Sequence, residues 1–79
     1  MLTAEQMRGA RALLGWRQED LAQASKVGLA TIQRLEKGRG PVMANVSTVL
    51  RIEEALGKAG IKFLDSDDGG GIGVRFRGD

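Results

Sequence analysis

The sequence has 79 residues, which is enough for one small domain. It contains no cysteine and no histidine, so disulfides, thiol and imidazole catalysis, and metal sites built on those side chains are excluded. The formal net charge is +2, and the excess of basic side chains falls within residues 1–40, so an anionic partner is expected at that half of the chain.

A first helix is predicted to run from Thr3 to Leu14. Thr3 and Gln6 have the spacing of a capping box, and Gly15 is the expected stop. Gly9 weakens the helix, which indicates close packing against a neighbouring element. The expected core face has helical spacing and consists of Met7, Ala10, Leu13 and Leu14.

Two short helices are predicted next, over residues 18–25 and 29–37, joined by a tight turn at residues 26–28. The second helix is expected to bury Leu21, Ala22 and Ala24, and the third Ile32 and Leu35. Gly38 is the expected left-handed residue after the third helix, and Pro41 prevents its continuation. Two helices joined in this way have the shape of a helix-turn-helix.

A fourth helix is predicted from Asn45, its cap, through Ala59. Beyond Gly60 the apolar residues alternate with polar ones, which predicts two antiparallel strands over about 61–64 and 72–77. A lone hairpin is only marginally stable, so this one is expected to pack on the fourth helix or to pair with another chain.

The segments QEDLA at 18–22, TI at 31–32 and LEKG at 35–38 resemble the Cro/phage-repressor class of helix-turn-helix proteins, the XRE family. The resemblance covers about residues 4–60. It implies a mainly α fold: a compact, four- to five-helix, lambda-repressor-like DNA-binding domain with a short C-terminal β-hairpin. Residues 1–60 are expected to form this domain, with the helix-turn-helix at about 18–37, and residues 61–79 a dimerisation element.

The helix at 29–37 is therefore the expected recognition helix in the major groove. With Ile32 and Leu35 turned inward, the predicted base-reading residues are Leu29, Ala30, Gln33 and Arg34. The predicted phosphate-binding residues are Arg17, Gln18, Thr31, Lys37 and Arg39.

Some residues are expected to have structural roles. Arg11 and Glu36 match a pair that joins the first helix to the third in this family, so they are predicted to form an ion pair. Trp16 is predicted to fill the core between the first two helices. Lys26 stands where the family carries glycine, so it is expected to adopt a left-handed conformation. Gly28 replaces the usual Ser or Thr cap of the recognition helix.

The function predicted from these features is a sequence-specific, double-stranded-DNA-binding transcriptional regulator, with no enzymatic activity, cofactor or metal. It is expected to act as a homodimer on an inverted repeat, because one such module reads too few bases for specificity. An alternative is an antitoxin-like interaction module whose tail binds a second protein, and a third reading is a nonspecific nucleic-acid binder. The apolar stretches are too short to span a bilayer and there is no signal-peptide core, so a cytoplasmic protein without membrane contact is expected.

The dimer is expected to form through the fourth helix and the strands at 61–77, whose apolar load is large for so small a chain. Strand pairing is expected across or beside the two-fold axis. The predicted dimerisation residues are Val49, Ile52, Leu56, Ile61, Phe63, Ile72, Val74 and Phe76.

Overall fold

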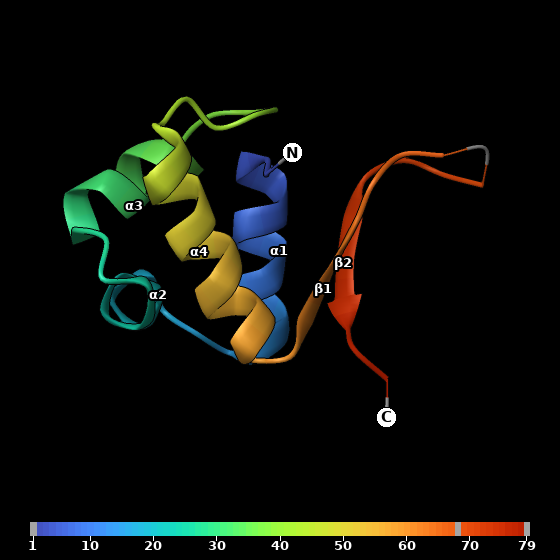
Figure 1. Ribbon diagram of the computed structural model, residues 1–79, viewed down its shortest axis with the longest axis horizontal. Coiled ribbons are helices and arrows are strands. Elements are labelled where there is room, and N and C mark those ends of the chain that lie inside the picture. Colours follow the sequence, from blue (N-terminus) through green and yellow to red (C-terminus); the bar gives the residue numbers. More distant parts are fainter. Residues whose placement is uncertain (1, 68, 79) are drawn as a thin grey trace.

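The computed structural model describes residues 2–67 and 69–78, which form four helices followed by a two-stranded antiparallel hairpin (Figure 1). The helices are α1 (Ala4–Leu14), α2 (Gln18–Ser25), α3 (Leu29–Glu36) and α4 (Val46–Lys58). The strands are β1 (Ile61–Leu64) and β2 (Gly73–Phe76). The mainly α architecture with a C-terminal hairpin is confirmed.

The starts of α1 and α4 follow from side-chain caps. The Thr3 hydroxyl accepts from the Gln6 backbone N–H at 3.1 Å, while the Gln6 side-chain oxygen accepts from the Thr3 N–H at 3.0 Å. Both halves of the capping box are therefore present. The Asn45 side-chain oxygen accepts from the Thr48 N–H at 2.9 Å and begins α4 in the same manner.

The turn between α2 and α3 has the strained residue that the sequence predicts. Lys26 adopts φ 59° and ψ 32°, the left-handed conformation. Ser25 is buried just before it, donating its hydroxyl hydrogen to the Leu21 carbonyl at 2.7 Å and accepting from the Val27 N–H at 3.3 Å. These bonds hold the turn that sets α2 against α3.

The end of α3 differs from the prediction. Lys37 is a right-handed cap, and the left-handed glycine is Gly40, at φ 73°, rather than Gly38. The cause is Arg8 of α1, whose Nη1 donates to the carbonyls of Glu36 and Gly38 and satisfies the end of the helix without a left-handed residue. The chain reverses two residues later than expected.

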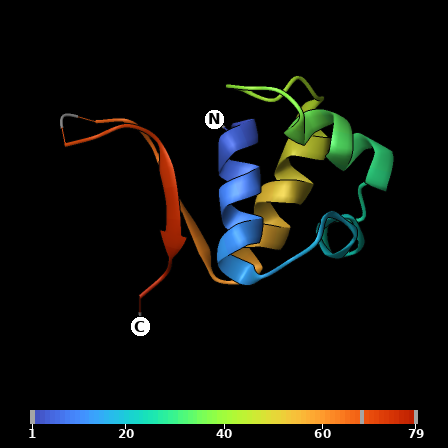
Figure 2. The same cartoon turned by 180° about the vertical axis from the view of Figure 1, so that it is seen from behind.

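The hairpin packs mainly along α1, and the expectation that it would lie on α4 holds only for the contact of β1 (Figures 1 and 2). Phe63 pairs with Val74 in the hairpin register, and both side chains pack against the core. A Cβ built on Gly9 would lie 3.2 Å from Cγ2 of Val74, which confirms the close packing expected at this glycine. Gln6 Nε2 also donates to the carbonyls of Leu64, at 3.3 Å, and Gly73, at 3.1 Å.

The core lies between the four helices and the inner face of the hairpin. Its largest fully buried side chains are Leu2, Met7, Leu21, Ile32, Ile52 and Leu56. Trp16 and Leu14 are half-buried against this core. Leu13 and Ala24, predicted to be buried, are exposed. Leu13 lies about 100° round α1 from Leu14, and the core accepts only one of these adjacent positions.

Three residues of the predicted dimerisation set, Ile52, Leu56 and Ile61, are at most 2% exposed and belong to the core of a single chain. Val49, Phe63 and Val74 are half-buried against the same core. The reason is that α2 and β1 pack on α4, so much of its apolar surface is used in folding the single chain. Of the predicted set, Ile72 and Phe76 are exposed.

Candidate nucleic-acid interface

The outward face of α3 carries the four residues predicted to read bases. Burying Ile32 and Leu35 orients this short helix and leaves Leu29, Ala30, Gln33 and Arg34 exposed. Ala30, Gln33, Arg34 and Lys37 line one shallow hollow of about 340 Å³. The spacing of two inward residues thus gathers amide, guanidinium and ammonium donors on one side of the helix.

Arg34 connects this hollow to the loop that follows α3. It also borders a smaller hollow of about 160 Å³, which includes Gly38, Arg39 and Met43. Arg34 Nη1 lies 3.5 Å from the Met43 carbonyl oxygen, which makes this a long and weak hydrogen bond. Arg34 therefore joins the hollow beside α3 to the basic loop, while Thr31 is half-buried on the same helix.

The basic loop is held against the start of α1 by contacts that the sequence reasoning missed. The Glu5 carboxylate accepts from the Gly40 N–H at 2.9 Å, and this bond lowers the pKa of Glu5. Backbone bonds from Ala4 N to Gly40 O at 2.9 Å and from Val42 N to Leu2 O at 3.1 Å lie on either side. Together with Arg8 they position the segment that carries Lys37 and Arg39.

Glu36 is the buried centre of the helix-turn-helix. Its carboxylate accepts from Arg11 Nε at 2.7 Å and from Arg11 Nη2 at 2.6 Å, a bidentate pair. The Glu36 and Arg11 side chains are 3% and 19% exposed. The hydrogen bonds that Arg11 donates to the Glu36 carboxylate raise the pKa of Arg11. Gln18 Nε2 also donates to Glu36 Oε1 at 3.3 Å.

These bonds fix where α2 begins relative to α3. Arg11 Nη1 donates to the Trp16 carbonyl at 3.0 Å, so the chain entering α2 is held from α1. The Gln18 amide then lies between the buried carboxylate and solvent at the first turn of α2. Arg17 is mostly exposed next to it, with Nε 3.8 Å from the Asp20 carboxylate. Neither Arg17 nor Gln18 lines the two hollows beside α3.

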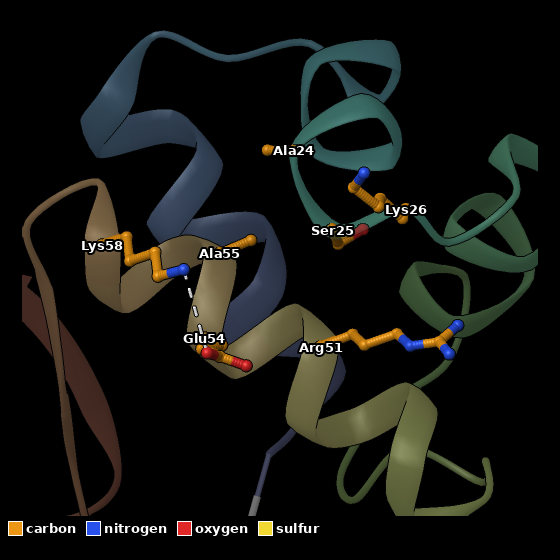
Figure 3. Close-up of a pocket in the computed structure, with 7 residues that line it drawn as sticks. All are labelled: Ala24, Ser25, Lys26, Arg51, Glu54, Ala55 and Lys58. Carbon is orange, nitrogen blue, oxygen red and sulfur yellow. Dashed lines mark ion pairs between the residues drawn. The ribbon is translucent and has the colours of Figure 1, made fainter.

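A separate groove of about 350 Å³ lies between α2 and α4 (Figure 3). Its walls carry Lys26, Arg51 and Lys58 against one carboxylate, Glu54, which pairs with Lys58 at 3.9 Å. The groove is basic, but it contains none of the residues predicted to contact DNA.

The described part of the chain shows no cluster of three or more Asp or Glu side chains arranged to hold a metal ion. None of the helices in residues 2–67 and 69–78 is long and apolar enough to cross a membrane.

One comparison with known proteins agrees with this geometry. The helix-turn-helix family model matches residues 7–62, which span most of α1 through the start of β1. A comparison with curated proteins finds no match. The matched segment covers well over half of the sequence and contains both helices of the motif and the exposed face of α3. The chain belongs to the XRE-type helix-turn-helix family of DNA-binding transcriptional regulators.

Proposed function

We propose that the protein regulates transcription in the cytoplasm by binding a specific inverted-repeat operator as a homodimer, with α3 of each copy in the major groove. The observation that carries this proposal is the exposed face of α3, where Gln33 and Arg34 share one hollow with Lys37. An arginine fork suits guanine O6 and N7, and a glutamine amide suits adenine. Leu29 and Ala30 are then placed for thymine methyl groups.

The proposed phosphate contacts surround this face. Lys37 and Arg39 follow α3 on the loop held by Glu5 and Arg8, and Thr31 lies on the helix itself. Arg17 and Gln18 lie at the first turn of α2, whose N-terminal N–H groups also suit a phosphate oxygen. Such contacts set the register of the protein on the duplex and carry no sequence information.

The test separates base reading from phosphate binding. Arg34→Ala is expected to lose preference for one guanine-containing position, a cost of about 1–3 kcal/mol of discrimination, and to retain nonspecific binding. Arg39→Ala is the matched control. It is expected to weaken binding to all sequences alike and to reduce the slope of log affinity against log salt by about one unit. The measurement is affinity for selected and scrambled duplexes at two salt concentrations.

An unchanged ratio between selected and scrambled DNA in Arg34→Ala would contradict the placement of α3. Equal affinity of the unaltered protein for both duplexes would instead support the nonspecific-binder reading.

A second candidate function is supported by the hairpin, which extends from the helices (Figure 1). Ile72, just before β2, and Phe76, at its end, are exposed. Exposed apolar residues on a strand suit an antitoxin-like contact with another protein. This reading predicts that the I72S/F76S double variant binds operator DNA normally and loses regulation in cells. Normal regulation by that variant would exclude the hairpin contact.

A further inference from the structure

The first half of α4 and the loop before it carry apolar side chains that the core leaves uncovered. Met43 is 83% exposed, Val46 73% and Leu50 55%. Val46 and Leu50 are one turn apart on α4, and Met43 lies just before the Asn45 cap. We refer to Met43, Val46 and Leu50 together with Gly57 as the α4 stripe.

Gly57 extends the stripe toward the end of the helix. It lies two turns after Leu50 and three turns after Val46, so the three residues share one side of α4. A Cβ at Gly57 would meet none of the described atoms within 4 Å, whereas one at Gly9 would press on Val74. Packing within one chain therefore does not require this helix-weakening glycine, and its lack of a side chain allows another chain to approach closely.

We infer that the α4 stripe docks a second copy of this chain, with the two α4 helices antiparallel about a two-fold axis at Leu50. The inference rests on the proposed function, which needs paired modules. The stripe is self-complementary about this axis. Gly57 lies two turns beyond Leu50 on α4 and the exposed Met43 lies just before the helix begins, so in the antiparallel pair each Met43 faces the end of the partner's helix that carries Gly57.

The charges of α4 support the same pairing. The first turn of α4 holds no acidic residue, although the free N–H groups there favour negative charge. In the antiparallel arrangement Glu54 lies opposite the partner's Val46, because both are four residues from Leu50. Figure 3 shows Glu54 on the flank of α4, beside Lys58. Each copy thus supplies the carboxylate that the other helix lacks.

The position of the stripe suits DNA binding. It begins at Met43, whose carbonyl oxygen lies 3.5 Å from the guanidinium of Arg34. A dimer axis beside the recognition helix holds the two copies of α3 at a fixed separation.

The test uses single cysteines in a chain that has none. Leu50→Cys is expected to form an intermolecular disulfide under mild oxidation on a duplex with both half-sites. The reason is that the axis brings the two Cα atoms within the disulfide range of about 4.4–6.8 Å. Arg51→Cys, about 100° round the helix, is the matched control and is expected to stay monomeric on denaturing gels. Phe76→Cys reports on pairing through the hairpin.

Cross-linking at Phe76→Cys without cross-linking at Leu50→Cys would overturn the inference, and so would failure at both positions on a duplex that the protein binds. Failure of the unaltered protein to select any duplex from random DNA would instead contradict the proposed function. The two failures are therefore distinguishable.

Gly57→Leu tests the gap without adding charge or a thiol. The added side chain enters open space in one chain, so the thermal midpoint of the monomer is not expected to fall. Affinity for the two-half-site duplex is expected to fall roughly tenfold or more, because two unpaired copies no longer bind as one unit. Affinity for a single half-site is expected to stay unchanged. Unchanged affinity for both duplexes would count against the inference.

Discussion

At the scale of single residues, Glu36 joins three parts of the helix-turn-helix through one carboxylate. It accepts two bonds from Arg11 of α1 and one from Gln18 of α2, while it lies at the end of α3. The carboxylate is almost fully buried. A buried pair contributes little against a well-packed apolar replacement, but removal of one partner leaves a charge without its counter-ion. Removal of one side chain from this network is therefore expected to lower the free energy of unfolding substantially.

Glu36→Gln keeps the shape of the side chain and removes its charge. It is expected to destabilise the fold by about 3–5 kcal/mol, since Arg11 loses its ion pair in a mostly buried site. Glu54→Gln is the matched control. Its pair with Lys58 is exposed, at 3.9 Å, and its loss is expected to cost less than about 1 kcal/mol. Urea denaturation followed by circular dichroism measures both, and equal costs would show that the network does not stabilise the domain.

At the scale of elements, the hairpin and α1 stabilise each other. Val74 lies in van der Waals contact with the helix where Gly9 leaves room, and Gln6 donates to the carbonyls of both strands. A two-stranded hairpin is only marginally stable alone, so this support explains how such short strands persist. The strands β1 and β2 are consequently part of the same fold as the helices.

Gly9→Leu tests this contact. The new side chain would occupy the space of Val74, and overpacking of this kind costs about 1–3 kcal/mol. Val74→Ala in the same chain is expected to restore part of the loss, because it makes room for the leucine. A thermal-denaturation double-mutant cycle over the four proteins measures the coupling. Strictly additive effects would mean that the strand does not lie on α1 in solution.

Features that depend on neighbouring residues could be predicted from the sequence, whereas features that depend on distant residues could not. The caps at Thr3 and Asn45 and the left-handed Lys26 depend on residues within a few positions, and the prediction was correct for each of them. The wrong prediction at Gly38 involves Arg8, which lies 30 residues away from it. Local rules cannot indicate that a distant side chain will satisfy the end of a helix.

In the candidate site, too, local features were predictable and long-range contacts were not. The exposed face of α3 follows from the spacing of Ile32 and Leu35, so its residues could be named from periodicity. The anchoring of the basic loop by Glu5 could not, because it depends on how α1 packs beside the loop. The burial of Ile52 and Leu56 was likewise missed, since an apolar helix face does not itself reveal whether its own chain or a second one covers it.

At the scale of the whole molecule, the recognition helix and the hairpin lie toward opposite ends of a long axis of 35 Å (Figure 1). Two copies joined through their hairpins would place the recognition helices up to about 70 Å apart, near two turns of the duplex. Pairing through the α4 stripe, which begins at Met43 beside Arg34, is expected to hold them closer and to suit half-sites about one turn, or ~34 Å, apart. The half-site spacing that the protein prefers therefore distinguishes the two interfaces.

A series of duplexes with varied spacing between half-sites tests this relation. The highest affinity is expected with half-site centres about 10 base pairs apart. Adding about 5 base pairs turns the second half-site to the opposite side of the duplex, so affinity is expected to fall roughly tenfold or more. Gel-shift titration with the unaltered protein measures the series. A maximum at two turns would favour pairing through the hairpin.

The seating of β2 on α1 also sets the order in which the chain acquires its structure during synthesis. Gln6 and Gly73, joined by a hydrogen bond, are 67 positions apart. At translation rates of about 5–20 residues per second, the ribosome delivers β2 roughly 3–13 seconds after the start of α1. During that interval the side of α1 around Gly9 lacks the strand that packs on it in the folded chain. The side of α1 around Gly9 is thus covered only by a segment made 67 positions after Gln6.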